Sequence, residues 1–371
     1  MTAGGAKRRI AVTGGGTAGH ILTALEILEA YRREFGAAGY FIGSAAGFET
    51  RIVPKHREEL ELVPGLPWAR QGWSGRARSL AVIPAGVVAA ARILRRRRTE
   101  LVIGTGGYVS FVVCLAARCL GIPVVIHEAN AVPGLANRLI GRFAALICTA
   151  GEETAHAFGR ATVVATGMPA GGLRSPGGDP EGPYRILVSG GSEGSPVLDR
   201  EAPRLLAELR QIVPEFSVLH LTGYRGRADV AAAYQAAGIE ATVAPFLEDF
   251  DAIYRGIRLA IVCPGARTLA ELAAWGIPCV LSPLPGAAND HHAANARLYS
   301  KQTGAPVALE GAWDRELLAG WIERALRDPA WRDEYRRRAL ALARPHAATE
   351  IALACERLMG EAGTVPLQNP C

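Results

Sequence analysis

The chain has 371 residues, of which 49% are hydrophobic and 20% are charged, and its formal net charge at pH 7 is +6. This length favours two domains, and the globular composition excludes a low-complexity array. The positive charge indicates an anionic partner but does not choose among nucleotides, phospholipid headgroups and nucleic acid.

The cysteines and the start of the chain both favour the cytoplasm. The seven cysteines are odd in number and lack the spacing of a metal site, so we expect reduced core residues. The start "MTAGGAKRR" leads directly into a predicted strand, so we expect no secretory signal. The best candidate for a membrane span, residues 101–126, contains Arg118, Pro123 and four glycines, which predicts strand, helix and strand instead.

Short runs rich in valine and isoleucine alternate with helical patterns along the chain. The strands predicted for a first sheet are residues 9–13, 40–45, 101–103, 124–127 and 145–149. Those predicted for a second sheet are residues 186–189, 217–221, 259–263 and 279–282. Continuous apolar strands separated by helices predict parallel sheets that are covered on both faces.

The segment "RSPGGDPEGPY", residues 174–184, is dense in glycine, proline and charge, which predicts a linker. We therefore predict one domain over residues 1–173 and a second over residues 174–345. Residues 346–371 are expected to form a helix that packs back on the first domain, followed by a loose tail. Each half opens with a strand, a glycine-rich turn and a helix, so the predicted fold class is α/β, with two Rossmann-like parallel-sheet domains facing a cleft.

The first glycine turn, in "RIAVTGGGTAGHILTALEIL", has the Gly14-x-Gly16-x-x-Gly19 pattern of a dinucleotide-binding loop. That fingerprint also needs an acidic residue after the second strand, where this chain has Gly43-Ser44-Ala45, so nicotinamide or flavin binding is disfavoured. His20 follows the last glycine and lies near the start of the helix. An imidazole there suits a general base, and a histidine that caps or lines the loop is the alternative.

Two further turns of the first half carry polar groups. "GTGGYVSF", residues 104–111, offers the hydroxyls of Tyr108 and Ser110, or is only a tight strand-to-helix turn. His127, Glu128 and Asn130 cluster at the end of the next strand, and such groups need each other or a ligand as partners.

The second half has three polar constellations. "GGSEG", residues 190–194, places Ser192 at a helix N-terminus that suits an anion, without the spacing of a P-loop. After the strand that ends at Cys263, a helix is predicted to start near Thr268. Glu271 in its first turn suits a ribose, and Arg267 suits a diphosphate. The alternative is a capping box from Thr268 to Glu271, which needs no ligand. His291 and His292 are adjacent on a helix and point about 100° apart, so no metal is expected.

Residues 66–98 mix Trp68, Trp73, Arg76 and Arg78 with an apolar helix that ends in four arginines. This composition suits an interface with anionic lipid, and a solvated basic helix end is the alternative. Nucleic acid is not an expected partner, because no fold motif for it accompanies the charge.

Five motifs in order resemble the MurG family, from about residue 8 to about residue 345. They are "GGGTAGH", "GTGGYVS", "GIPVVIHEANAVPGLANR", "LVSGGSEG" and "GARTLAELAAWGIP", the last followed by "NA" at 295–296. The resemblance implies a GT-B glycosyltransferase of family 28, which moves N-acetylglucosamine from a UDP donor to a lipid-linked muramyl acceptor. It implies no metal and no cofactor.

The resemblance also implies roles for individual residues. His20 stands in the place of the catalytic base, and Tyr108 and Glu128 match positions on the acceptor side. The positions implied to bind the donor are Thr17, Ala18, Gly19, Asn130, Ser192, Leu247, Ala266, Arg267, Thr268, Leu269, Ala270, Glu271 and His292. Of these, Leu247 matches the backbone contact to uracil and Glu271 matches the ribose ligand.

The chain also departs from the family pattern around sugar and phosphate recognition. The departures are Thr23, Met168, Gly171, Pro264, Arg267, His291 and His292. They leave open whether the donor sugar is N-acetylglucosamine or another hexosamine, and Arg267 is a candidate to replace the arginine that is missing at Gly171.

Our hypothesis from the sequence is therefore an inverting, metal-independent transferase that uses a UDP-hexosamine and a lipid-linked acceptor. We expect a cytoplasmic protein, peripheral at the inner face of the cell membrane. A specialised transferase for a phosphoglycolipid or other secondary metabolite and a non-catalytic nucleotide-sugar-binding protein are the alternatives. A glycosidase is disfavoured, because no pair of acidic residues stands out at facing strand ends.

Overall fold

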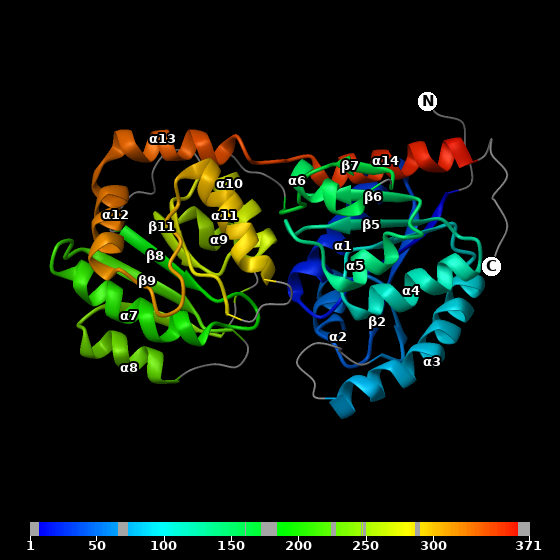
Figure 1. The fold of residues 1–371 in the computed structure, drawn as a ribbon, viewed down its shortest axis with the longest axis horizontal. Helices are drawn as coiled ribbons and strands as arrows, with labels where there is room; N and C mark the ends of the chain where they lie inside the picture. Colours follow the sequence, from blue (N-terminus) through cyan, green and yellow to red (C-terminus); the bar gives the residue numbers. More distant parts are fainter. Residues whose placement is uncertain are drawn as a thin grey trace. The chain divides into compact units, whose positions relative to one another are not determined.

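The computed structural model describes residues 7–65, 73–159, 161–171, 184–223, 228–245, 247, 250–285 and 290–362, with the backbone alone at 73–80, 228, 250–251 and 361–362. The chain forms two compact units. The first consists of Met1–Pro169 together with His346–Cys371, and the second of Ala170–Pro345. Each unit is a parallel β-sheet with helices on both faces (Figure 1).

The first unit has a seven-stranded sheet in the order β3-β2-β1-β4-β5-β6-β7. Its strands are β1 (Arg9–Thr13), β2 (Ala38–Ser44), β3 (Leu60–Val63), β4 (Leu101–Gly104), β5 (Val124–Glu128), β6 (Leu146–Thr149) and β7 (Val163–Ala165). Every pairing in this sheet is parallel, as predicted. The sequence missed β3 and β7, the two edge strands, because both are short and nearly all of their side chains are exposed or only partly buried.

Helices of the first unit cover both faces of this sheet. They are α1 (Ala18–Phe35), α2 (Glu49–Ile52), η1 (Val53–His56), α3 (Trp73–Arg97), α4 (Tyr108–Cys119), α5 (Leu135–Ile140), α6 (Glu152–Ala155), η2 (His156–Phe158) and α14 (Ala347–Ala362). One core lies between the sheet and the α1–α14 pair, and the other lies under α3 and α4. Residues 101–126 form β4, α4 and β5, as predicted. Within the described residues, no helix is both long enough and apolar enough to cross a bilayer.

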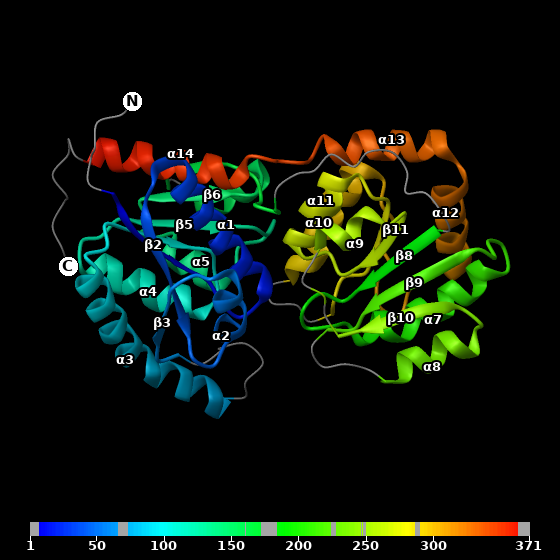
Figure 2. The same ribbon diagram turned by 180° about the vertical axis from the view of Figure 1, so that it is seen from behind.

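The last helix belongs to the first unit because its apolar face completes that unit's core. Ile351 and Cys355 of α14 are fully buried beside α1, as Figure 2 shows for the two helices. Polar contacts also hold the helix, one of them from Arg33 Nη2 to Thr349 Oγ1 at 2.8 Å. Glu356 Oε1 accepts a hydrogen bond from the Tyr31 hydroxyl at 2.5 Å and one from Arg8 Nε at 2.7 Å. Arg8 and Glu356, which are 348 positions apart in the sequence, are therefore in contact within this unit.

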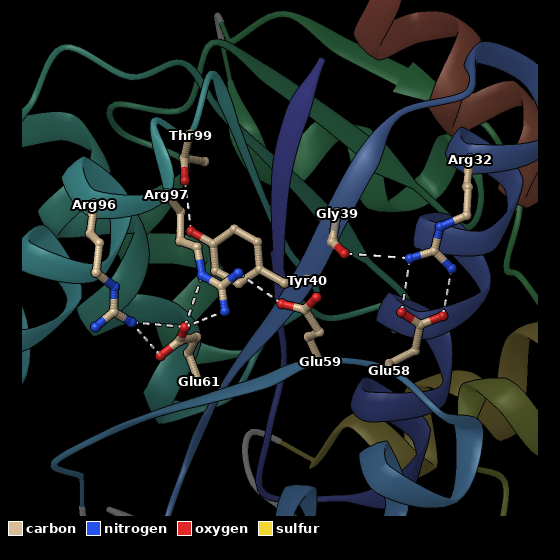
Figure 3. A network of polar contacts seen from close by, with 9 residues as sticks. All are labelled: Arg32, Gly39, Tyr40, Glu58, Glu59, Glu61, Arg96, Arg97 and Thr99. Carbon is tan, nitrogen blue, oxygen red and sulfur yellow. Dashed lines mark hydrogen bonds and ion pairs between the residues drawn. The ribbon is translucent and has the colours of Figure 1, made fainter. Parts of the chain in front are cut away.

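The edge formed by β3 carries a network of ion pairs (Figure 3). Glu61 accepts from Arg96 Nη2 at 2.8 Å and from Arg97 Nη2 at 2.6 Å, and Arg97 Nη1 lies 2.8 Å from Glu59 Oε2. The Arg97 guanidinium also lies over the Tyr40 ring, 5.2 Å from its centroid. Two of the four arginines that end the α3 segment are therefore neutralised by acids of the edge strand, which also blunts that edge.

The second unit has a five-stranded parallel sheet in the order β10-β9-β8-β11-β12. Its strands are β8 (Tyr184–Ser189), β9 (Phe216–Leu221), β10 (Glu240–Ala244), β11 (Leu259–Val262) and β12 (Cys279–Leu281). Its helices are α7 (Pro196–Arg210), α8 (Ala228–Ala236), α9 (Phe250–Arg255), α10 (Ala266–Trp275), α11 (His291–Thr303), α12 (Arg315–Arg327) and α13 (Pro329–Leu340). The sequence missed β10, another edge strand with no buried position. The predicted linker lies outside the described residues except for Tyr184.

Two cores also flank the second sheet. Helices α7, α8 and α12 pack on one face, and α9, α10, α11 and α13 pack on the other. Because all strands in each unit are parallel, the turns after them gather at one edge of each sheet. Every polar motif that the sequence singled out after a strand lies at such an edge.

Candidate active site

The turn after β1 leads into α1 and positions His20. Thr17 is the N-cap of this helix, and its hydroxyl accepts from the His20 backbone N–H at 3.5 Å. His20 lies in the first helical turn, as predicted, and its side chain is half-buried. Thr17 therefore caps the helix, and its Oγ1 also lies 3.3 Å from His20 Nδ1.

The His20 ring bonds back to the glycine loop. Its Nδ1 lies 2.8 Å from the carbonyl oxygen of Gly15. A carbonyl only accepts, so Nδ1 carries the proton and Nε2 of the neutral ring keeps a lone pair. This tautomer is the one that a general base acting through Nε2 requires.

The glycines of the first two turns let two loops interlock. Gly15 N–H donates to the Gly106 carbonyl at 3.1 Å. A Cβ on Gly107, where φ is +83°, would lie 2.2 Å from the Gly15 carbonyl oxygen. A Cβ on Gly106, where φ is +112°, would lie 3.1 Å from His20 Nε2. These glycines are therefore needed for contact between loops and for room beside the imidazole.

Glu128 at the end of β5 organises the segment that follows it. Its Oε1 accepts from Asn130 N at 2.9 Å and from Asn130 Nδ2 at 3.1 Å. Its Oε2 accepts from Gly134 N at 3.1 Å and from Asn137 Nδ2 at 2.9 Å. With four donors around a carboxylate that is 2% exposed, Glu128 holds residues 129–137 in place.

Asn137 links this cluster to the surroundings of His20. Its Nδ2 also donates to the His127 carbonyl at 3.1 Å. The same Gly106 Cβ position that lies near His20 Nε2 lies 3.5 Å from Asn137 Nδ2. The sequence analysis named Asn137 only as part of a motif. Helix α5 has six residues, which is too short for a periodic hydrophobic pattern to indicate that Asn137 is buried.

The neighbouring hydroxyls and His127 have structural contacts of their own. Ser110 Oγ donates to the carbonyls of Thr13 at 3.0 Å and Gly106 at 2.8 Å. The Tyr108 ring lies against Gly65, where an added Cβ would be 2.6 Å from its Cε1. Burial lowers the pKa of His127 to about 4, so this ring is neutral at pH 7, with Nε2 donating to the Gly167 carbonyl at 2.9 Å.

In the second unit, the turn after β8 differs from the prediction at one point. Helix α7 begins at Pro196 and is capped by Ser195, whose Oγ accepts from Leu198 N at 3.3 Å. Ser192 therefore lies in the preceding turn, half-buried, and not at the helix start itself. The turn is held tightly, because a Cβ on Gly194 would lie 2.1 Å from the Thr222 carbonyl oxygen.

The turn after β11 places Glu271 in a polar cluster. Helix α10 begins at Ala266 with Gly265 as its N-cap and no side-chain cap, so the capping box between Thr268 and Glu271 does not form and that alternative is wrong. The Glu271 carboxylate, 5% exposed, lies 2.8 Å from Arg267 Nε and accepts from the Tyr254 hydroxyl at 2.9 Å. Tyr254 was missed by the sequence, since only the fold brings α9 beside α10.

The other residues predicted to bind the donor point in different directions. Leu269 is buried in the core, so only its backbone faces the turn. Ala266, Thr268 and Ala270 are half-buried on the same helix. Leu247 is 38% exposed, and its neighbours at 246 and 248–249 lie outside the described residues.

The rings of His291 and His292 are in an edge-to-face contact, with their centroids 4.7 Å apart. His292 Nδ1 accepts from Leu284 N at 3.3 Å, so Nε2 carries the proton of the neutral ring. Burial lowers the pKa of His292 to about 4. Across the described residues, no group of three or more His, Cys, Asp or Glu side chains is arranged to hold a metal ion.

Comparison with known families decides the classification. Residues 10–149 match the glycosyltransferase family 28 N-terminal domain, and residues 185–349 match the glycosyltransferase family 28 C-terminal domain. The chain belongs to glycosyltransferase family 28. The MurG resemblance and the GT-B fold class predicted from the motifs are thereby confirmed.

Individual relatives of this family 28 member agree. The chain is 35% identical over 356 residues to the UDP-N-acetylglucosamine–N-acetylmuramyl-(pentapeptide) pyrophosphoryl-undecaprenol N-acetylglucosamine transferase of Anaeromyxobacter sp. strain Fw109-5, covering 95% of this chain and 93% of the relative. It is 33% identical over 357 residues to the transferase of the same name from Syntrophotalea carbinolica, covering 95% and 99%. The crystal structure of Acinetobacter baumannii MurG superposes with a TM-score of 0.73 at 26% identity, covering 94% of this chain and 99% of that one.

The substitution Asn137→Asp tests the Glu128 cluster. It places a second carboxyl group where Nδ2 now lies 2.9 Å from Glu128 Oε2. Two carboxylates so close cannot both ionise, so the folded variant holds a proton and the pKa of the pair is raised. Its stability is therefore retained in acid and lost as the pH rises.

Urea unfolding at pH 5 and pH 8 measures this effect. The deficit against the unsubstituted protein is expected to be larger at pH 8 by about 2 kcal/mol. Gln235→Glu, at an exposed position of α8, is the matched control and should show no such difference. Equal losses of unfolding free energy at both pH values would contradict the proposed repulsion between the new carboxyl group and the Glu128 carboxylate.

Proposed function

We propose that this chain transfers N-acetylglucosamine from UDP-N-acetylglucosamine to a lipid-linked muramyl acceptor, with inversion at the anomeric carbon. The curated relatives carry this activity in their names and span nearly the whole chain. The observation that carries the proposal is the His20 imidazole, whose Nδ1 is committed to the Gly15 carbonyl at 2.8 Å and whose Nε2 keeps its lone pair.

His20 supplies the base in a single displacement. Its Nε2 takes the proton from the acceptor hydroxyl as that oxygen bonds to the anomeric carbon. The bond from this carbon to the diphosphate oxygen breaks at the same time, and UDP leaves with the electron pair. Because the acceptor attacks opposite to the leaving group, the anomeric configuration inverts. Thr17, Ala18 and Gly19 line the donor sugar beside this base in the proposal.

The second unit binds the nucleotide in this proposal. Glu271 accepts the ribose hydroxyls, while Arg267 and the first backbone N–H groups of α10 receive the charge that develops on the departing UDP. Preorganised donors of this kind each lower a barrier by about 2–4 kcal/mol. The backbone at Leu247 meets the uracil, and the turn at Ser192 contacts the donor.

His292 replaces an amide of the family with a group of similar hydrogen-bonding character. Its ring is neutral, and its Nε2 carries a proton because Nδ1 accepts from Leu284. A neutral imidazole N–H donates as the amide of a glutamine does. We assign His292 to a hydroxyl of the donor sugar on this ground, and we assign Asn130 to the same sugar.

On the acceptor side, we propose a direct contact for Tyr108 and an indirect role for Glu128. The four donors around the Glu128 carboxylate support this division, since they satisfy both of its oxygens. Glu128 then shapes the segment that the acceptor meets instead of binding the acceptor itself.

Transfer from labelled UDP-sugars tests the function. UDP-N-acetylglucosamine is expected to be used in preference to UDP-glucose and UDP-N-acetylgalactosamine, with a muramyl pyrophosphoryl lipid as acceptor. His20→Ala should lower kcat by about 10²–10⁴-fold, because it removes general-base catalysis. His156→Ala, an exposed histidine of the same unit, is the control and should leave kcat unchanged. Transfer to a phosphoglycolipid but not to the muramyl lipid would contradict the proposed acceptor.

The substitution Tyr254→Phe tests the nucleotide site. It removes the hydroxyl that donates to Glu271 Oε2 and so leaves one buried carboxylate oxygen without this bond. Calorimetry should show UDP binding weakened by about tenfold, which corresponds to about 1.4 kcal/mol. Tyr234→Phe is the control, since this buried tyrosine bonds His220 instead. Equal weakening by both variants would assign the effect to the core and not to Glu271.

We further propose that α3 binds anionic lipids at the inner face of the cell membrane. Arg92 and Arg95 are exposed on this helix, whereas Arg96 and Arg97 are paired with Glu59 and Glu61. Trp68, Trp73, Arg76 and Arg78, which the sequence assigned to the same surface, have no described side chains.

Cosedimentation with vesicles tests this association. Binding to phosphatidylglycerol vesicles is expected to exceed binding to phosphatidylcholine vesicles and to fall at high salt, because exposed charges are screened. Arg92→Glu combined with Arg95→Glu should weaken it, and Lys301→Glu in the other unit should not. Binding that is equal for both lipids would contradict the proposal.

A further inference from the structure

A buried glutamate stands behind the catalytic loop. Glu49 is the first residue of α2 and is only 1% exposed. Glycines surround its side chain: an added Cβ would lie 2.3 Å from Glu49 Oε1 on Gly15, 2.8 Å from its Cβ on Gly43, and 1.7 Å from its Oε2 on Gly47. A larger residue at these positions would displace the carboxyl group.

Within the part of the chain that the structure describes, no lysine, arginine or histidine forms an ion pair with this carboxyl group. Among the described residues, its buried Oε2 has no hydrogen-bond partner and Glu49 forms no ion pair. Burial raises the pKa of Glu49, and hydrogen bonds to the backbone at Glu49 and Ser44 partly oppose that shift. A buried carboxyl group without a cation costs stability, so the ion pairs of the described residues do not account for a glutamate at this position.

Gly15 lies between Glu49 and His20 and contacts both. Its Cα faces the carboxyl group, and its carbonyl oxygen lies 2.8 Å from His20 Nδ1. Its N–H donates to the Gly106 carbonyl at 3.1 Å. Gly15 is thus held on three sides, and the imidazole and the carboxyl group lie on two of them.

We infer that Glu49 is a positioning residue for His20, which braces the Gly15 carbonyl against Nδ1 and stabilises, through its negative charge, the imidazolium formed when Nε2 takes the acceptor proton. The inference rests on the proposed role of His20 as the base. The charge of Glu49 acts across Gly15. Because Glu49 is buried, its Coulomb interactions are stronger than in bulk water.

The other titratable groups that the structure describes around His20 are His127, Glu128 and Tyr108. His127, which faces it from the end of β5, has its pKa lowered to about 4 by burial and stays neutral. Glu128 is separated from His20 by Asn137 and is bound by four donors. From α4, the Tyr108 ring lies against Gly65.

The pH profile of kcat/KM tests the inference. Glu49→Gln keeps the shape of the side chain and removes its charge, so the pKa of His20 should fall. The acid limb should therefore move to lower pH by about one unit. A weaker base should also lower kcat on the plateau by about threefold to tenfold, with the donor KM unchanged. Glu58→Gln, which removes a charge paired with Arg32 in the same unit, is the control and should leave the profile in place.

Each outcome bears on one claim. Superimposable profiles for Glu49→Gln and the unsubstituted protein, with His20→Ala inactive, would overturn the role of Glu49 and leave His20 as the base. Full activity of His20→Ala would overturn the proposed base itself. If Glu49→Gln does not fold, Glu49→Asp keeps the charge, and its limb should stay in place while kcat falls. A limb that moves in Glu49→Asp would also overturn the inference.

Discussion

The hydrogen bond between His20 Nδ1 and the Gly15 carbonyl is the contact on which the proposed chemistry depends. At 2.8 Å it fixes the tautomer of the ring and leaves the lone pair of the neutral ring on Nε2. It exists only because Thr17 starts the helix three residues before His20 and the turn after β4 holds Gly15 in place. The parallel pairing of β1 with β4 brings these two turns together, so sheet topology and catalytic geometry are one constraint.

The same constraint explains why the first turn imitates a dinucleotide-binding loop. In both cases glycine allows a close approach of backbone, but here the approaching group is another loop of the protein. A side chain on Gly107 would meet the Gly15 carbonyl, and a side chain on Gly15 would meet those of Glu49 and Val109. A glycine pattern thus reports the closeness of the contact and leaves the identity of the partner to other residues.

The sequence predicted the central strands of both sheets because these are continuous apolar runs, and it missed β3, β7 and β10 because edge strands are only half covered. His20 and Glu271, which lie in the helices that follow β1 and β11, were named as candidates by their place in a motif. Glu49, Asn137 and Tyr254 were not, because each acquires its role from a contact with a distant segment. The capping box failed for a local reason: Gly265 starts α10 three residues before Thr268.

The return of α14 to the first unit has a consequence for biosynthesis. The face of α1 that opposes the sheet is covered by Ile351 and Cys355, near the end of the chain. During translation, this face stays uncovered until the whole second unit has been made, although α1 itself is among the first elements to emerge. The packing around the helix that carries His20 is therefore completed last. A chain truncated before α14 would contain every proposed catalytic residue but would lack part of the core of the first unit.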